Sequence, residues 1–258
     1  WTREEDLRRD LYRPAAMARY RGVVANGQAV VLEGHVAGPS VIHQSTKRAS
    51  GREMSGADRE HVSGAFDQPY GVPNFRISGY LTDTALPIGY WRSVGASFNG
   101  FFFESFVDEM AHAAQQDPMR FRIDLAKREH LPSANALETV AEMSGWTGET
   151  AENIGRGVAF SHTFGSSVAQ VIEVEDTGNG IRINKVWIAC DVGTALDPGN
   201  IEAQMSGGCL YGLSAAVMGE ITLKDSEVEQ TNFPDYDALR MHNAPAFEVR
   251  ILENNAYL

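Results

Sequence analysis

The sequence predicts an α+β fold, a mixed β-sheet with packed helices in two lobes. Residues 102–114 repeat apolar side chains every three to four positions, as one face of a helix does. From Gly157 onward the apolar side chains alternate, which is the period of a strand. Strand-like and helical segments are grouped rather than strictly alternating, which favours α+β over a doubly wound sheet. We expect a first lobe over residues 1–150 and a second over residues 151–258, both within one larger domain.

The first lobe is expected to open with a strand pair over residues 23–36. Apolar residues there flank Asn26-Gly27, a dipeptide suited to a two-residue hairpin turn. Residues 43–64 are polar and nearly free of large apolar side chains, so they are predicted to form a long exposed loop. Over residues 71–95, prolines and glycines favour extended chain broken by turns.

Three helices follow this extended chain. The first covers residues 102–114. Asp117 is suited to cap the second helix and Pro118 to occupy its first turn, so this pair ends one helix and begins the next. The third helix is expected over residues 133–144, with Gly145 ending it.

The second lobe is expected to contain two hairpins, a helix and a final strand. Alternating valines and isoleucines lie on both sides of residues 177–180, where the first hairpin turns. Residues 200–217 have a helical pattern but are rich in glycine. The second hairpin is predicted over residues 221–233, around Lys224-Asp225, and the last strand over residues 247–252.

The composition is that of an ordinary globular protein, with 43% hydrophobic and 22% charged residues. A net charge of -12 repels phosphate backbones and anionic lipid, which argues against nucleic acid as a partner. The longest apolar runs are far shorter than a membrane span, so no direct membrane insertion is expected. Cys190 and Cys209 are the only cysteines, which excludes a four-thiolate iron–sulfur or zinc site within this chain.

Candidate chemistry is sparse when the residues are taken one at a time. Glu104, Asp108 and Glu109 recur at helical spacing and are expected to form a solvated face, next to an exposed His112. Cys190 follows an apolar strand, where a thiol is expected to behave as a small buried hydrophobe. The seven histidines show no pairing at the spacing of metal ligands, so no metal-ligating residue is predicted.

Three glycines occur close together in residues 206–212. Two interpretations stay open for them. They could let backbone amides approach a pyrophosphate, or they could allow another helix to pack closely.

Longer stretches of the chain resemble the beta subunits of isoquinoline 1-oxidoreductase and related aldehyde dehydrogenases, which belong to the xanthine oxidase (molybdenum hydroxylase) family. The likeness includes residues 87–100, which contain Trp91-Arg92-Ser93-Val94-Gly95. It is collinear over nearly the whole chain, through residues 1–6, 12–14, 104–109, 117–122, 141–146, 168–171, 190–193, 197–198, 202–208, 212–216, 219–222, 232–236 and 239–241.

The resemblance implies a molybdenum–pterin cofactor, in the cytosine dinucleotide form of bacterial members. It implies hydroxylation of an aldehyde or an N-heterocycle, with water as the oxygen source. The partners implied are a small-molecule substrate and a small 2Fe-2S subunit, whose iron–sulfur clusters carry the electrons away. The compartment stays open between bacterial cytoplasm and periplasm.

Five residues are assigned to cofactor binding by this resemblance: Arg92, Ser93, Val94, Gly95 and Gln204. An arginine fork suits anionic, oxygen-rich groups, and the backbone amides that follow can donate to them. Val94 stands where xanthine oxidase has an aromatic residue beside its ring substrate, and it leaves more room there. Without the resemblance, Arg92 fits a surface ion pair equally well and Gln204 an ordinary helix surface residue.

No catalytic residue is assigned within the chain. The family's catalytic glutamate, a general base, is expected beyond Leu258, and a Gly-Gly-Gly-Phe-Gly loop before Trp1. The resemblance therefore implies an enzyme fragment that is inactive by itself. The alternative is a non-catalytic interaction or scaffold piece without metal.

Overall fold

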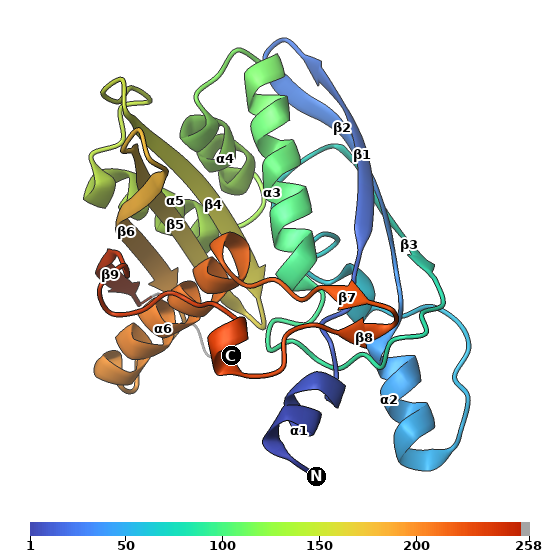
Figure 1. The fold of residues 1–258 in the computed structure, drawn as a ribbon. Helices are drawn as coiled ribbons and strands as arrows, with labels where there is room; N and C mark the ends of the chain where they lie inside the picture. Colours follow the sequence, from blue (N-terminus) through green and yellow to red (C-terminus); the bar gives the residue numbers. More distant parts are fainter. Residues whose placement is uncertain (254–258) are drawn as a thin grey trace.

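The computed structural model describes residues 1–253 and confirms an α+β fold (Figure 1). Its strands form two mixed sheets and one short ribbon. The first sheet has the order β1-β2-β3 and comprises β1 (Met17–Ala25), β2 (Gln28–Gly38) and β3 (Asn74–Leu81). The second has the order β4-β5-β6-β9 and comprises β4 (Ile154–Thr163), β5 (Ser166–Asp176), β6 (Ile181–Asp191) and β9 (Ala246–Leu252). Each sheet has antiparallel hairpin neighbours and one parallel edge pair, β2–β3 or β6–β9.

The predicted hairpins are confirmed. Asn26 and Gly27 both have positive φ, 52° and 73°, which is the conformation that a two-residue turn between twisted strands requires. A turn over residues 177–180 joins β5 to β6. The ribbon pairs β7 (Leu223–Lys224) with β8 (Glu227–Val228), so this hairpin is shorter than residues 221–233.

The predicted helices are confirmed, with shifted ends. They are α3 (Ala96–Ala113), α4 (Pro118–Lys127), α5 (Leu131–Ser144) and α6 (Pro198–Val217). Asp117 caps α4 by accepting a hydrogen bond from the Arg120 amide at 2.9 Å. Gly145 ends α5 in the left-handed conformation, with φ of 57°. A helix that was not predicted, α1 (Arg3–Arg9), opens the chain and has no buried residue.

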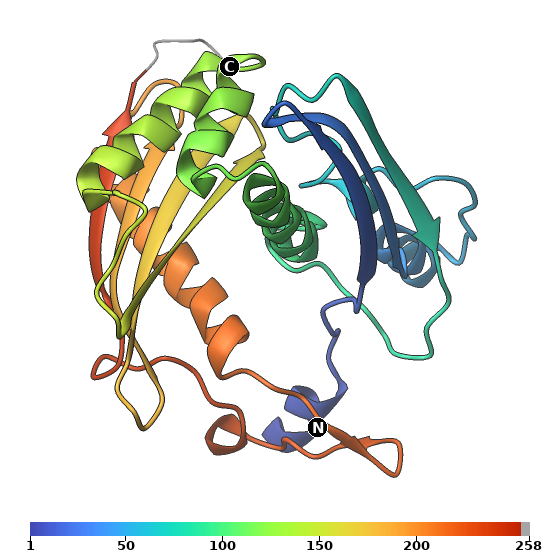
Figure 2. The same cartoon turned by 90° about the horizontal axis from the view of Figure 1, so that it is seen from above.

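The helix α3 lies between the two sheets and contacts both β1 and β4 (Figure 2). Its Phe103 is fully buried in a core shared with Leu32 of the first sheet and Val171 of the second. The helix α5 packs on the face of β5 that carries Val171, whereas α6 lies on the opposite face, where Cys209 donates to Gln170. One core thus spans both sheets, and a lobe boundary at residue 150 stays a prediction.

The expectation of one long exposed loop over residues 43–64 is wrong. Residues 41–50 form the helix α2 (Val41–Ser50), whose first turn is capped by Ser40, and a 3-10 turn, η1 (Glu60–Val62), follows. Only residues 47–57 are continuously exposed, while Asp58 and His61 are buried. Ser40 Oγ accepts from the His43 amide and donates to Asp58. Polar side chains here are hydrogen-bonded within the fold, so the polarity of the segment did not mean that all of it is exposed.

The expectation of a wholly solvated carboxylate face on the first helix is wrong for Glu104. This side chain is buried and pairs with Arg122 of α4, while Asp108 is half exposed. His112 is exposed, as expected. Cys190 has no exposed surface, which confirms its prediction as a small buried residue.

Candidate functional site

The structure brings together two segments that the sequence analysis singled out. Arg92 Nη2 donates a hydrogen bond to Gln204 Oε1 at 2.8 Å, across 112 residues of chain. Arg92 lies in the loop before α3, and Gln204 lies in the second turn of α6. Among residues 1–253, no carboxylate forms an ion pair with Arg92, so most of its N–H donors remain available.

The 91–95 loop has a strained turn. Val94 has φ of 52°, which is unusual for a β-branched residue, and its amide donates to Trp91 O at 2.8 Å. Gly95 follows, and a Cβ at this position would lie 2.2 Å from Glu60 O, so only glycine fits. Ser93 completes the loop between Arg92 and Val94. All four loop residues predicted from the sequence therefore lie in one turn at the start of α3.

Residues 58–64 pack against the 91–95 loop and the start of α3, and none of them was predicted as a site residue from the sequence. The Asn99 side-chain amide is fully buried and donates to His61 O and Ser63 O, both at 2.9 Å. Asp58 accepts from Ser40 Oγ at 2.7 Å and from the Glu60 amide at 2.9 Å. No spacing rule marks the Asn99 and Ser40 contacts in the sequence, because they join residues from different elements.

The helix α6 presents its glycines to open space. Gly207, Gly208 and Gly212 would each accept a Cβ without meeting another atom, and α6 has no buried residue. Gln204 is exposed on the same helix. The backbone near Gln204 is thus approachable by a large group. Beside this surface lies Arg92, which has no ion-pair partner among residues 1–253. An arginine in such a place is suited to bind anionic, oxygen-rich groups of a cofactor.

Aromatic residues surround Trp91. The Tyr211 ring of α6 stacks on the indole, with centroids 4.9 Å apart, and the Arg13 guanidinium carbon lies 4.7 Å from the indole centroid. A cavity of about 520 Å³ adjoins these residues and Arg92. Arg92 therefore lies at the edge of an aromatic-lined hollow.

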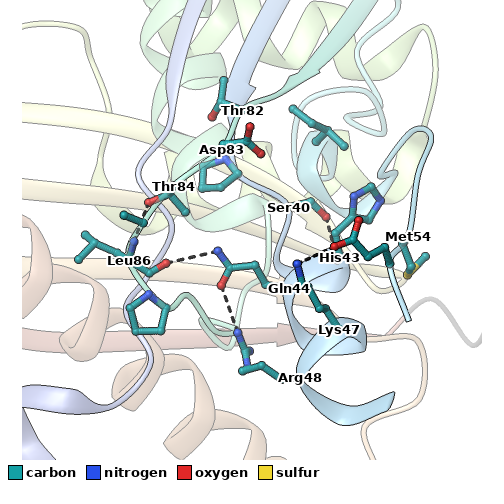
Figure 3. Close-up of a pocket in the computed structure, with 15 residues that line it drawn as sticks. Ser40, His43, Gln44, Lys47, Arg48, Met54, Thr82, Asp83, Thr84 and Leu86 are labelled. Carbon is teal, nitrogen blue, oxygen red and sulfur yellow. Dashed lines mark hydrogen bonds and ion pairs between the residues drawn. The ribbon is translucent and has the colours of Figure 1, made fainter. Parts of the chain in front are cut away.

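A second cavity, of about 630 Å³, lies elsewhere, between α2 and residues 81–87 (Figure 3). Its polar groups are bonded to one another: Lys47 pairs with Glu53, and Arg48 donates to Gln44. Gln44 in turn donates to Leu86 O at 3.3 Å. The Lys47 charge is already neutralised by Glu53, and none of the residues that the resemblance assigns to the cofactor lines this cavity, so it is a weaker candidate than the Arg92 side.

Neither thiol is suited to ionise at neutral pH. Burial raises the pKa of Cys190 to about 11, and burial likewise raises the pKa of Cys209 to about 11. Within residues 1–253, no three side chains of His, Cys, Asp or Glu gather as a potential metal site. The ligand chemistry on this chain is therefore that of Arg, amide and backbone groups.

Residues 94–245 match the family model of the molybdopterin cofactor-binding domain. The beta subunit of isoquinoline 1-oxidoreductase from Brevundimonas diminuta is 31% identical over 99% of this chain and 33% of its own length. The membrane-bound aldehyde dehydrogenase [pyrroloquinoline-quinone] of Gluconacetobacter polyoxogenes is 25% identical over 97% of this chain and 36% of its own length. The chain thus spans about a third of the length of these curated relatives.

Solved structures share the fold. Quinoline 2-oxidoreductase from Pseudomonas putida 86 superposes with a TM-score of 0.76 at 11% identity, covering 98% of this chain and 57% of that one. The aldehyde oxidoreductase of Desulfovibrio gigas also gives 0.76, at 9% identity, over 98% and 45%. In the described part of the chain, no helix is long and apolar enough to cross a membrane. Since the family model covers more than half of its 258 residues, the chain belongs to the molybdopterin cofactor-binding domain family.

Proposed function

We propose that the chain is part of the large subunit of a molybdenum hydroxylase that oxidises an aldehyde or an N-heterocycle, with water as the oxygen source. The observation that carries this proposal is the Arg92–Gln204 hydrogen bond, which joins the two predicted cofactor segments. The names of relatives support the substrate classes, since they include isoquinoline, nicotinate and aldehyde oxidoreductases.

In this proposal, Arg92 binds anionic oxygens of the cofactor with its unused N–H groups. Gln204 takes one donor and thereby orients the guanidinium plane. The backbone amides of residues 93–95 add donors, and the Val94 side chain leaves space for a ring substrate. When bound, the molybdenum–pterin group supplies the centre that accepts two electrons from the substrate.

The finer assignments rest on the resemblance. We propose the cytosine dinucleotide form of the cofactor and a separate 2Fe-2S subunit as electron acceptor. Two cysteines cannot supply the four thiolates of such a cluster, so any cluster lies outside these 258 residues.

The test is the metal content of Arg92→Ala, made in a host that produces the cofactor, with the flanking sequence that the gene encodes. Charge-assisted hydrogen bonds to a buried ligand are worth about 1.5–3 kcal/mol, so we expect about tenfold or greater loss of bound molybdenum at limiting cofactor. Arg76→Ala is the matched control, because Arg76 is an exposed arginine on β3 with only a 4.0 Å ion pair. Equal molybdenum in both variants would contradict the role of Arg92.

The open face of α6 favours a second candidate function, a non-catalytic interaction piece. Exposed helix glycines also permit close packing of another helix. A wild-type protein that contains no molybdenum in a cofactor-producing host, yet copurifies with a partner subunit, would support this alternative over the enzyme.

A further inference from the structure

We propose that Trp91 and Tyr211 are positioning residues, which hold Arg92 against Gln204 in the geometry that receives the cofactor. This inference rests on the proposed function of the Arg92–Gln204 pair and assigns a role to residues outside it. Trp91 directly precedes Arg92, so whatever holds the indole also holds the backbone from which the guanidinium extends. Its aromatic contact with α6 is therefore a second tether on the same loop.

The two tethers reach one face of α6. Gln204 and Tyr211 are seven residues apart, about two helical turns, so their side chains project from the same side of the helix. Trp91 stacks on Tyr211 with an interplanar angle of 29°, and Arg92 donates to Gln204. Two neighbouring loop residues thus contact α6 at points two turns apart. A slip or rotation of the helix against the loop would break both contacts together.

Arg13 strengthens the tether from a third segment. Its guanidinium lies over the Trp91 ring, and the neighbouring Tyr12 exchanges backbone hydrogen bonds with Pro87 and Gly89, at 2.9 and 3.0 Å. The chain that follows α1 is thereby fixed to the chain that leads into the 91–95 loop. A cation beside an indole is attracted by the negative face of the ring.

The physical benefit is preorganisation. Arg92 is exposed and has a long flexible side chain, so an untethered guanidinium loses much conformational freedom when it binds an anion. Fixing the backbone at Trp91 and one N–H at Gln204 removes part of that loss before binding. Tyr211 has 58% of its surface exposed, so its packing contributes little to the core. Its stacking on Trp91 therefore serves a purpose other than core packing.

The first experiment uses Tyr211→Leu in the cofactor-loaded protein, with Tyr211→Phe as the conservative variant. A contact between two aromatic rings changes an equilibrium constant by up to about tenfold beyond the effect of burying their surface. We therefore expect cofactor to be released about tenfold faster from Tyr211→Leu. Tyr211→Phe keeps the ring and should release it at the wild-type rate. Phe164→Leu is the control, because Phe164 is an exposed aromatic in the turn between β4 and β5 and does not line the cavity beside Arg92.

A double-mutant cycle separates positioning from simple loss of contact. If Tyr211 acts through the Arg92–Gln204 pair, then adding Tyr211→Leu to Gln204→Ala should cause little further acceleration of release. Additive effects would overturn the proposal. Wild-type release from Tyr211→Leu would overturn it as well.

A measurement on the cofactor-free chain keeps this test independent of the proposed function. We expect the side-chain amide NMR signal of Gln204 to shift in Tyr211→Leu toward its position in Arg92→Ala, while the signal in Phe164→Leu stays in place. An unchanged Gln204 signal in Tyr211→Leu would overturn the positioning role. If the wild-type protein binds no molybdenum but the NMR shift occurs, the proposed function fails and the positioning geometry stands.

Discussion

At the residue scale, the junction of the 91–95 loop with α3 shows how little freedom this site has. Val94 takes a left-handed conformation that costs a β-branched residue stability, and it is held there by hydrogen bonds from Ser97 and to Trp91. Gly95 lies directly against the carbonyl oxygens of Glu60, His61 and Ser63. The strained residue Val94 lies two positions after Arg92, which has no ion-pair partner among residues 1–253. Retained backbone strain at such a position is typical of a loop shaped for binding.

The first prediction concerns Gly95→Ala. A methyl group there would overlap the backbone oxygen of Glu60, which cannot move as a flexible side chain does, so we expect a loss of about 1–3 kcal/mol in the free energy of unfolding. Gly100→Ala is the matched control, because Gly100 lies within α3 with open space around its would-be Cβ. That control should be neutral or stabilising by up to about 1 kcal/mol. Urea denaturation of both variants measures these two free energies of unfolding. Similar losses in Gly95→Ala and Gly100→Ala would contradict the expected overlap with Glu60 O.

At the scale of elements, a buried ion pair joins α3, α4 and β4. Arg122 is fully buried and donates from Nε to Glu104 Oε2 at 2.8 Å, and the same oxygen accepts from the Phe160 amide at 2.8 Å. Burial raises the pKa of the Glu104 carboxyl, whereas the Arg122 guanidinium and the Phe160 amide oppose that rise. Arg122 also pairs with the half-exposed Asp108.

The second prediction compares these two carboxylates. Glu104→Ala would leave the Arg122 charge buried without its main partner, so we expect about 3–5 kcal/mol of destabilisation. Asp108→Ala removes a half-exposed partner of the same arginine and should cost less than about 1 kcal/mol. Thermal and urea unfolding provide the measurement. If the two variants lost equal stability, Glu104 would not be the residue that compensates the buried charge.

At the scale of the whole molecule, two partly or fully buried histidines connect distant elements. His61 Nε2 donates to Val36 O, 3.3 Å away, and the ring is faced by Asp58 and the Phe98 ring. His162 contacts Ser167 Oγ at 3.0 Å and is faced by His130 and Asp67. Burial lowers the pKa of both imidazoles below their ordinary value of 6.5.

The third prediction follows from the sign of these shifts. Between the lowered pKa and about 6.5, the unfolded chain binds more protons than the folded one, so stability falls as the pH drops through this window and is full above it. We expect a lower urea midpoint at about pH 5.5 than at about pH 7.5. His162→Gln should reduce this difference, whereas His112→Gln, which removes an exposed imidazole, should retain it. A midpoint that rises on acidification would contradict the prediction.

The sequence by itself determined the family and most of the local elements, although not the helices α1 and α2. Apolar periodicity located α3 and the strands of the second sheet, while Asn26-Gly27, Asp117 and Gly145 marked a turn, a cap and a helix end. Each of these signals is local, because a residue's own conformational preference produces it. The loop containing Arg92 was likewise identified from a contiguous run of residues.

Only the tertiary structure decided which polar residues are buried and which distant segments meet. The sequence pattern predicted Glu104 on a solvated helix face and Asp58 in an exposed loop, yet each is buried and hydrogen-bonded to a group from another element. The meeting of Arg92 with Gln204 depends on α6 lying beside the 91–95 loop, across 112 residues. Periodicity reports which face of an element is apolar, but the partner of a polar group is set by how whole elements pack, and no local pattern encodes that arrangement.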